Sequence, residues 1–215
     1  MTSTAISAQG STLQIGTGSG GAKTISGTVG VGNPTVLTST AHGLNNGDVV
    51  TLAALTGADA ALLNGQTCVV QFKTTNTFAV AVDTTGKTIT VGSGTATPVT
   101  YTTIGNLKTF SGFDGQASEL DRTNFGSTAK EFVLGLVDYG QFSFDVDYDF
   151  TDAGQAAVLA AQVSGLLKNF KLTLPDTHTA SFTAYVKRLP TAGGVDQIVK
   201  RSGATVRISG AVTWA

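Results

Sequence analysis

The sequence predicts a mainly β protein of the α+β class, in which antiparallel strands pack as a sandwich with a single helix. Three observations predict it. Thr and Gly account for 35 and 27 of the 215 residues, and Thr favours strands while Gly favours turns. Residues 141–150 alternate between apolar and polar side chains, as in a strand with one buried face. Elsewhere, short runs of strand formers are separated by turn-forming pairs.

The first hundred residues predict several short strands. The first is expected at Ser11–Gly16, where Leu13 and Ile15 alternate with polar residues. Further strands are expected at Asp48–Ala53, Gln66–Phe72, Thr77–Val82 and Thr88–Val91. The turns between them are expected at Asn45-Asn46-Gly47, Asn64-Gly65 and Thr85-Gly86. This pattern is typical of a compact small β domain.

The remaining residues predict longer strands and the helix. Tyr101–Gly112 is expected to be a strand with a bulge or bend at Gly105-Asn106, Phe113–Lys130 a long polar loop, and Gln141–Phe150 the clearest strand. The helix is expected at Ala153–Leu167, capped by Thr151 or Asp152, with Ala157, Leu159, Ala160 and Val163 as its apolar side. The last strands are expected at Phe170–Leu174, Ala180–Leu189 and Thr205–Trp214, with a turn at Pro175-Asp176.

Charged residues are distributed unevenly along the chain. Residues 1–100 contain three Lys and three Asp, whereas residues 101–215 contain the other ten bases and eleven acids. This shift suggests a domain boundary near Thr100, and the stretch Gly18–Gly21 suggests a second one. The net charge of −1 and two isolated basic doublets argue against a nucleic-acid binder. No run of about 18 apolar residues predicts a membrane span, and the first twenty residues lack the pattern of a secretory signal.

Residues with catalytic or metal-binding potential form no recognisable constellation, so we expect no enzyme, no metal and no cofactor. Asp145, Asp147 and Asp149 have calcium-loop spacing, but the alternating aromatic residues place them on one face of a strand instead. His42 and His178 lie in different segments and are expected to be polar turn residues. The single cysteine, Cys68, lies in an apolar run and is expected to be a buried small hydrophobe.

Residues 104–214 resemble the major tail tube proteins of long-tailed bacteriophages. The order and spacing of several segments carry the likeness: Ser118–Phe125, Lys130–Gly140, Gln141–Phe150, Asp152–Leu167, Phe170–Asp176, Phe182–Val186 and Arg207–Thr213. Ser11–Gly16 fits the first strand of that family. Residues 27–100 depart from the minimal family pattern and resemble a small β module of phage structural proteins. Its signature here is Thr40–Val50, Leu63–Gly65 and Asn76–Val80.

The resemblance implies a tail-tube fold of two packed antiparallel sheets flanked by one helix. It assigns residues 1–26 and 101–215 to the tube domain and residues 27–100 to an inserted β domain on the outer surface. It implies hexameric rings that stack head to tail into the tail tube, through which DNA passes non-specifically into the host. The expected partners are the chain itself, the tape measure protein, the tail terminator and tail-tip proteins. The expected location is the virion tail, after assembly in the host cytoplasm.

Two sets of residues are candidates for functional surfaces. Asp145, Asp147 and Asp149 are candidates for an acidic lumen wall that repels DNA, unless they face the outer solvent. The segment Phe113–Lys130 is the candidate for ring-to-ring stacking, unless it is a mobile surface loop. Its charges and its aromatic residue would set register and anchor the contact, and they are Glu119, Asp121, Arg122, Phe125 and Lys130.

Other functions stay open at the level of the sequence. A tail terminator or distal tail protein forms single rings instead of a tube. A type VI secretion-like tube protein shares the fold, so the fold alone does not discriminate. A tail-tip adhesin or carbohydrate-binding module is expected to expose clustered aromatic residues, and the inserted segment has only Phe72 and Phe78. An enzyme would need a pocket with perturbed titratable groups.

Overall fold

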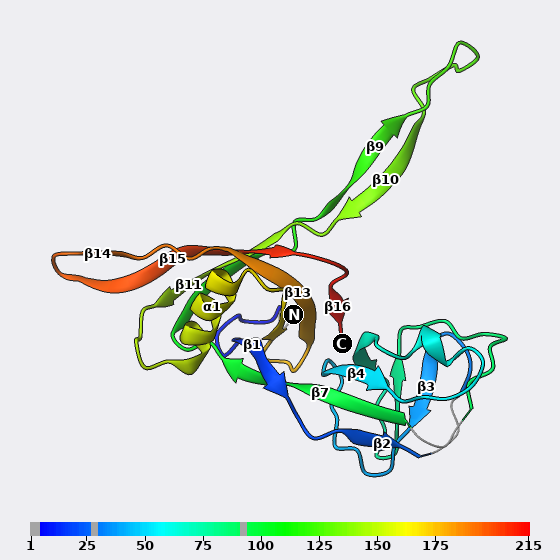
Figure 1. Ribbon diagram of the computed structural model, residues 1–215. Helices are drawn as coiled ribbons and strands as arrows, with labels where there is room; N and C mark the ends of the chain where they lie inside the picture. The colour runs from blue at the N-terminus through cyan, green and yellow to red at the C-terminus, as the bar shows by residue number, and fades with distance from the viewer. Residues whose placement is uncertain (1–4, 27–29, 91–93) are drawn as a thin grey trace. The chain divides into compact units, whose positions relative to one another are not determined.

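The computed structural model describes residues 5–26, 30–90 and 94–215. These residues form a mainly β protein whose strand pairs are antiparallel, which confirms the predicted mainly β class (Figure 1). The chain divides into two compact units. The first unit contains residues 1–104, 168–181 and 213–215, and the second contains residues 105–167 and 182–212.

The first unit is built on a curved run of short strands in the order β3-β6-β5-β4-β7-β1-β12, with β2 paired to β7. Their bounds are β1 Thr12–Ser19, β2 Lys23–Ile25, β3 Thr35–Thr38, β4 Val49–Ala53, β5 Thr67–Gln71, β6 Thr77–Val80, β7 Gly94–Thr103 and β12 Lys168–Thr173. The unit also contains the 3₁₀ turn η1 at Ala60–Leu62, the first residues of β13 (Thr179–Arg188) and β16 at Thr213–Trp214. The strands predicted near residues 11, 48, 66, 77 and 170 are therefore confirmed.

Residues 25–96 have a hydrophobic core of their own. Leu37, Val50, Leu52, Val70 and Phe78 are fully buried in one cluster with the other apolar residues of β3 to β6. β7 lies at the edge of this cluster: it pairs with β2 and β4 through its first half and with β1 through its second. It continues through Thr100, where the charge distribution suggested a boundary. The expected limits of an inserted domain, 27 and 100, stay a prediction, and residue 27 lies outside the described residues.

The predicted turns of this module are confirmed. Gly47, Gly65 and Gly86 each have a positive φ, of 84°, 81° and 69°, in the left-handed region that glycine adopts without steric cost. The strand predicted at Thr88–Val91 is wrong. Thr90 makes only an isolated bridge to Thr56, and Val91 lies outside the described residues. Its β-forming side chains have no neighbouring ladder along which to continue, and strand formation depends on such pairing.

The second unit is a four-stranded sheet with one helix and two hairpin extensions. The strand order is β13-β15-β11-β8, with β14 paired to β15, and β9 and β10 form a separate two-stranded sheet. The bounds are β8 Leu107–Gly112, β9 Gln116–Asp121, β10 Phe132–Asp138, β11 Gln141–Asp147, α1 Ala153–Ser164, β14 Ala192–Gly194 and β15 Gln197–Ile208. Phe142 of β11 packs against Phe110, Phe113 and Phe182 in the core.

The alternation predicted for the clearest strand is confirmed over its first six residues and fails at its end. Phe142, Phe144 and Val146 are buried, whereas Ser143 and Asp145 are partly exposed. β11 ends at Asp147, and Phe150 is 84% exposed. The Tyr148 amide still donates to the Val199 carbonyl of β15 at 2.8 Å. The chain then turns at Asp149, whose carboxylate accepts a hydrogen bond from the Thr151 amide.

Three other predicted elements need correction. The expected loop Phe113–Lys130 contains β9, which pairs with β10 over most of its length. The bend predicted at Gly105-Asn106 is confirmed, since Asn106 has a φ of 59°, but it divides the expected strand Tyr101–Gly112 into two strands, β7 and β8. The expected last strand begins earlier, at Gln197, and is interrupted between Ile208 and Thr213, where Gly210 has a φ of 96°. Left-handed backbone at these positions cannot continue a strand.

Helix α1 begins as predicted and buries a different face. The carboxylate of Asp152 caps it by accepting a hydrogen bond from the Gln155 amide, and Gly165 ends it. The predicted apolar side is wrong, since Leu159 and Val163 are 39% and 81% exposed. Gln155 sets the rotation of the helix, because its buried Nε2 donates to the carbonyls of Gly105 and Asp147. The buried residues are therefore Gly154, Gln155, Val158 and Ala161.

Candidate interaction surfaces

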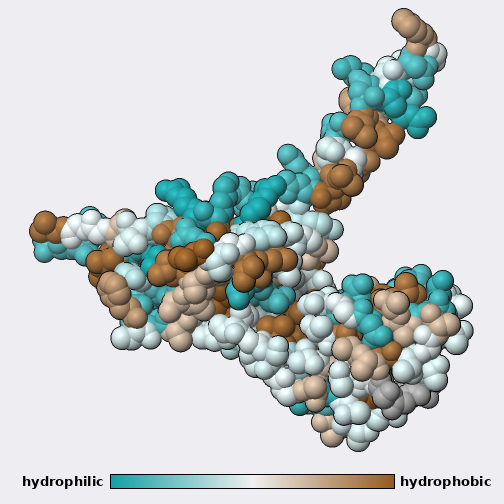
Figure 2. All heavy atoms as spheres, in the orientation of Figure 1, coloured by the Kyte–Doolittle hydropathy of each residue, from teal (hydrophilic) through white to brown (hydrophobic). Residues whose placement is uncertain are grey.

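The β9–β10 hairpin of the second unit exposes several large apolar side chains. Its two strands pair only with each other in Figure 1, and Figure 2 shows apolar side chains on the lower half of the hairpin and mostly hydrophilic ones toward its upper end. On β10, Phe132, Leu134, Leu136 and Val137 are 52%, 70%, 90% and 56% exposed, and Leu120 of β9 is 57% exposed. A two-stranded hairpin is marginally stable by itself in water, and exposed apolar patches of this kind mark interaction sites.

The structure brings the predicted stacking residues into this hairpin. Glu119 and Asp121 lie on β9, opposite Leu134 and Phe132 of β10. Arg122 lies 4.0 Å from the carboxylate of Glu131, and Phe125 at the tip is fully exposed. Lys130 precedes β10 and is also exposed. The exposed face of β10 was not predicted from the sequence, although the apolar run Phe132–Val137 was its signal.

The three candidate lumen acids each have a different partner. Asp145 accepts hydrogen bonds from the Thr109 hydroxyl and the Gly203 amide. Asp147 forms a 2.9 Å ion pair with Lys108. Asp149 lies beyond the end of β11, where hydrogen bonds from the side chain and amide of Thr151 lower the pKa of its carboxyl group. Their placement in a lumen stays a prediction.

Helix α1 presents a second apolar surface. No charged residue occurs between Ala153 and Leu167, and Leu159, Val163, Leu166 and Leu167 are exposed. Leu159 and Val163 lie on one face of α1 because they are spaced by four, and Leu166 and Leu167 follow directly after its end at Gly165. An exposed helix without charge is unusual for a surface in contact with water, so this face is a second candidate for contact with another chain.

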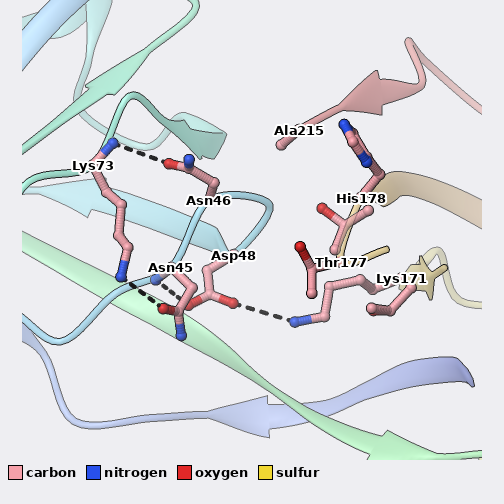
Figure 3. Close-up of a pocket in the computed structure, with 10 residues that line it drawn as sticks. Asn45, Asn46, Asp48, Lys73, Lys171, Thr177, His178 and Ala215 are labelled. Carbon is pink, nitrogen blue, oxygen red and sulfur yellow. Dashed lines mark hydrogen bonds and ion pairs between the residues drawn. The ribbon is translucent and has the colours of Figure 1, made fainter. Parts of the chain in front are cut away.

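The first unit contains a polar cavity of about 420 Å³ (Figure 3). Its lining residues are Asn45, Asn46, Asp48, Lys73, Lys171, Thr173, Thr177, His178, Thr179 and Ala215. The Nζ atom of Lys171 lies 3.2 Å from Asp48 and 4.6 Å from the centre of the Tyr101 ring. Lys73 Nζ donates to Asn45 at 3.0 Å, and the exposed His178 pairs with Asp176. The ion pair between Lys171 and Asp48 therefore joins β12 to the 45–48 turn at the wall of this cavity.

The remaining chemically distinctive residues are His42, His178 and Cys68. His42 was expected to be a polar turn residue, but it is buried: it accepts from the Leu44 amide, contacts the Thr77 carbonyl and packs against Phe78. His178 lies in an exposed turn as predicted. Cys68 is partly buried, and burial raises the pKa of its thiol, so little reactive thiolate is present at neutral pH. Among residues 5–26, 30–90 and 94–215, no three His, Cys, Asp or Glu side chains cluster closely enough to hold a metal ion.

Comparison with known proteins gives no match: neither a protein-family model nor a curated protein sequence corresponds to this chain. Within the described part of the chain, no helix has the length and apolar character needed to cross a membrane. The surfaces and contacts of the chain itself are therefore the basis for inferring its function.

Proposed function

We propose that this protein is a structural subunit that self-assembles into hexameric rings and that these rings stack into the tail tube of a long-tailed bacteriophage. The exposed apolar β9–β10 hairpin carries the proposal. In a monomer its apolar side chains stay in contact with water, whereas in a homopolymer a neighbouring subunit covers them. The segments that resemble tail tube proteins coincide with the hairpin, β11, α1, β12, β13 and β15. Tube assembly requires contacts between unlike surfaces of identical subunits, which propagate instead of closing on a pair.

Several features support a structural role over the alternatives. The exposed surfaces are apolar and extended, on a hairpin and on a helix face, as in contacts between proteins. The adhesin alternative calls for clustered exposed aromatic residues, and in the module at residues 25–96 Phe78 is buried while Phe72 is exposed. In this proposal the hairpin contacts the next subunit, DNA passes through the tube without specific binding, and the subunit has no catalytic task.

The double variant Leu134→Ser/Leu136→Ser tests the proposal. Burying one leucine contributes about 2 kcal/mol, so losing two is expected to raise the protein concentration needed for assembly by more than about a hundredfold. Sedimentation velocity over a concentration series measures this, and circular dichroism verifies the fold. Leu62→Ser, at an exposed leucine of the first unit, is the matched control and is expected to assemble like wild type. Unchanged assembly of the double variant would remove the hairpin from the proposed contact.

A further inference from the structure

Arg201 of β15 is a buried cation without an acidic partner in the described chain. Its side chain is 5% exposed. The Nη1 atom donates to the Leu189 carbonyl at 3.4 Å, and the guanidinium lies 4.2 Å from the centre of the Tyr148 ring. Among the described residues, Nε has no hydrogen-bond partner. None of the ion pairs among the described residues includes Arg201. A buried charge is costly unless a carboxylate compensates it, so a partner group from outside this subunit is expected.

The Tyr148 ring that contacts this cation, and the strand that carries the cation, have exposed apolar neighbours. Phe150 is 84% exposed and its ring packs 4.4 Å from that of Tyr148. Val199, two residues before Arg201 on β15 and therefore on the same face of the strand, is 45% exposed. We name the surface formed by Tyr148, Phe150, Val199 and Arg201 the Arg201 patch. Aromatic residues around an arginine are the composition typical of the central residues of protein interfaces.

Glu119 is the carboxylate that best fits this patch. The sequence has 14 acidic side chains, and within the described part of the chain Glu119 and Asp196 are the two that make no hydrogen bond or ion pair. The acids that do have partners there are Asp48, Asp59, Asp83, Asp114, Asp121, Glu131, Asp138, Asp145, Asp147, Asp149, Asp152 and Asp176. Asp196 lies in the turn between β14 and β15, with a φ of 59°. Glu119 lies on a strand among exposed apolar residues, directly opposite Leu134.

We propose that the β9–β10 hairpin of one copy docks on the Arg201 patch of a second copy, with the Glu119 carboxylate neutralising Arg201. The hairpin face that carries Glu119 also carries Phe132 and Leu134, because directly paired residues share a face. It offers an apolar surface with an unpaired negative charge, and the patch offers an apolar surface with an uncompensated positive charge. The inference rests on the proposed self-assembly and names its contact. Since two different surfaces meet, the contact repeats from copy to copy.

Charge exchange tests this contact. Glu119→Arg is expected to raise the concentration for half-assembly at least about tenfold, because like charges then meet in a desolvated contact. Arg201→Glu is expected to have a similar effect, and the double variant Glu119→Arg/Arg201→Glu is expected to assemble within about threefold of wild type. Sedimentation velocity provides the measurement. Lys87→Glu, at an exposed lysine of the first unit, controls for net charge and is expected to leave assembly unchanged.

A second pair of substitutions keeps the test valid if the Arg201→Glu subunit misfolds, which circular dichroism would reveal. Arg201→Gln removes the charge and is expected to make assembly insensitive to Glu119→Gln, whereas Glu119→Gln weakens the assembly of wild type. Equal effects of Glu119→Gln in both backgrounds would overturn the pairing. If Asp196→Lys weakens assembly and Glu119→Arg does not, the assignment of Glu119 as the partner of Arg201 is likewise overturned. If the wild-type protein assembles but both charge reversals, like Lys87→Glu, leave assembly unchanged, this contact alone is overturned. If the wild-type protein stays monomeric, self-assembly is overturned as well.

Discussion

Replacing Gly47 by alanine is expected to destabilise the first unit by about 3 kcal/mol, from left-handed backbone strain and from overpacking. Gly47 has a φ of 84°, and an added Cβ would overlap the Thr179 hydroxyl and lie 3.0 Å from the Thr179 Cβ atom. Hydrogen bonds on both sides of this residue hold the backbone in place. The Gly47 carbonyl accepts a hydrogen bond from Ser181 Oγ at 2.7 Å, and its amide donates to the Val70 carbonyl at 2.9 Å.

Urea denaturation followed by the fluorescence of Trp214, the single tryptophan, measures this loss. Trp214 belongs to the first unit and pairs with β13 at Ala180, next to the Gly47 contact. Gly43→Ala is the matched control, because Gly43 also has a positive φ, of 66°, but has no atom within 4 Å of an added Cβ. The control isolates the backbone cost, expected to be about 1 kcal/mol. Equal losses in the two variants would show that Gly47 is not packed against Thr179.

Replacing Gln155 by alanine is expected to cost the second unit about 3 kcal/mol, because buried polar groups lose their partners. Gln155 is 3% exposed. Its amide nitrogen donates to the carbonyls of Gly105 and Asp147, and its oxygen accepts from the Asp149 amide. One side chain thus joins α1 to the segment before β8 and to the end of β11.

The helical circular dichroism signal during urea denaturation reports this loss. Gln162→Ala on the same helix is the matched control, since Gln162 is partly exposed and its side chain makes no hydrogen bond in the described chain. It is expected to be neutral or slightly stabilising, because alanine is the better helix former. A Gln155→Ala variant as stable as the Gln162→Ala variant would contradict the role assigned to Gln155.

Elements governed by local patterns were predictable from the sequence. The alternation in Gln141–Asp147 places Phe142 and Phe144 inside, and this information lies within a few consecutive residues. Turns at Gly47 and Gly65 follow from the conformations that Asn-Gly pairs favour. The helix start follows from the ability of the Asp152 side chain to accept a backbone hydrogen bond.

Elements governed by tertiary contacts were not predictable. The β9 segment, Gln116–Asp121, is polar and becomes a strand only through its pairing with β10, and strand propensity depends strongly on such neighbours. The exposed face of α1 was expected to be buried, because apolar residues usually face the core. The contacts of the Gln155 side chain with Gly105 and Asp147 set the opposite rotation, and residues 105 and 147 give no sign of this in the sequence.

The candidate interaction surfaces also contain features that were predictable from the sequence and features that were not. The charged and aromatic residues of the hairpin were identified from composition, whereas the exposed face of β10 and the uncompensated charge of Arg201 emerge only from the fold. Asp145 and Asp147 were grouped by their common strand face, but their neighbours Thr109 and Lys108 come from β8, and strand pairing at that distance along the chain has no local signal.

Electron microscopy of the purified wild-type protein at rising concentration tests the central claim most directly. The account predicts long hollow tubes with a regular axial repeat, built from stacked rings. Their loss in the Leu134→Ser/Leu136→Ser variant would then connect the tubes to the hairpin. Monomers at every concentration, from a protein whose circular dichroism shows it to be folded, would contradict self-assembly. Single rings that never stack would contradict the tube and favour a terminator-like role.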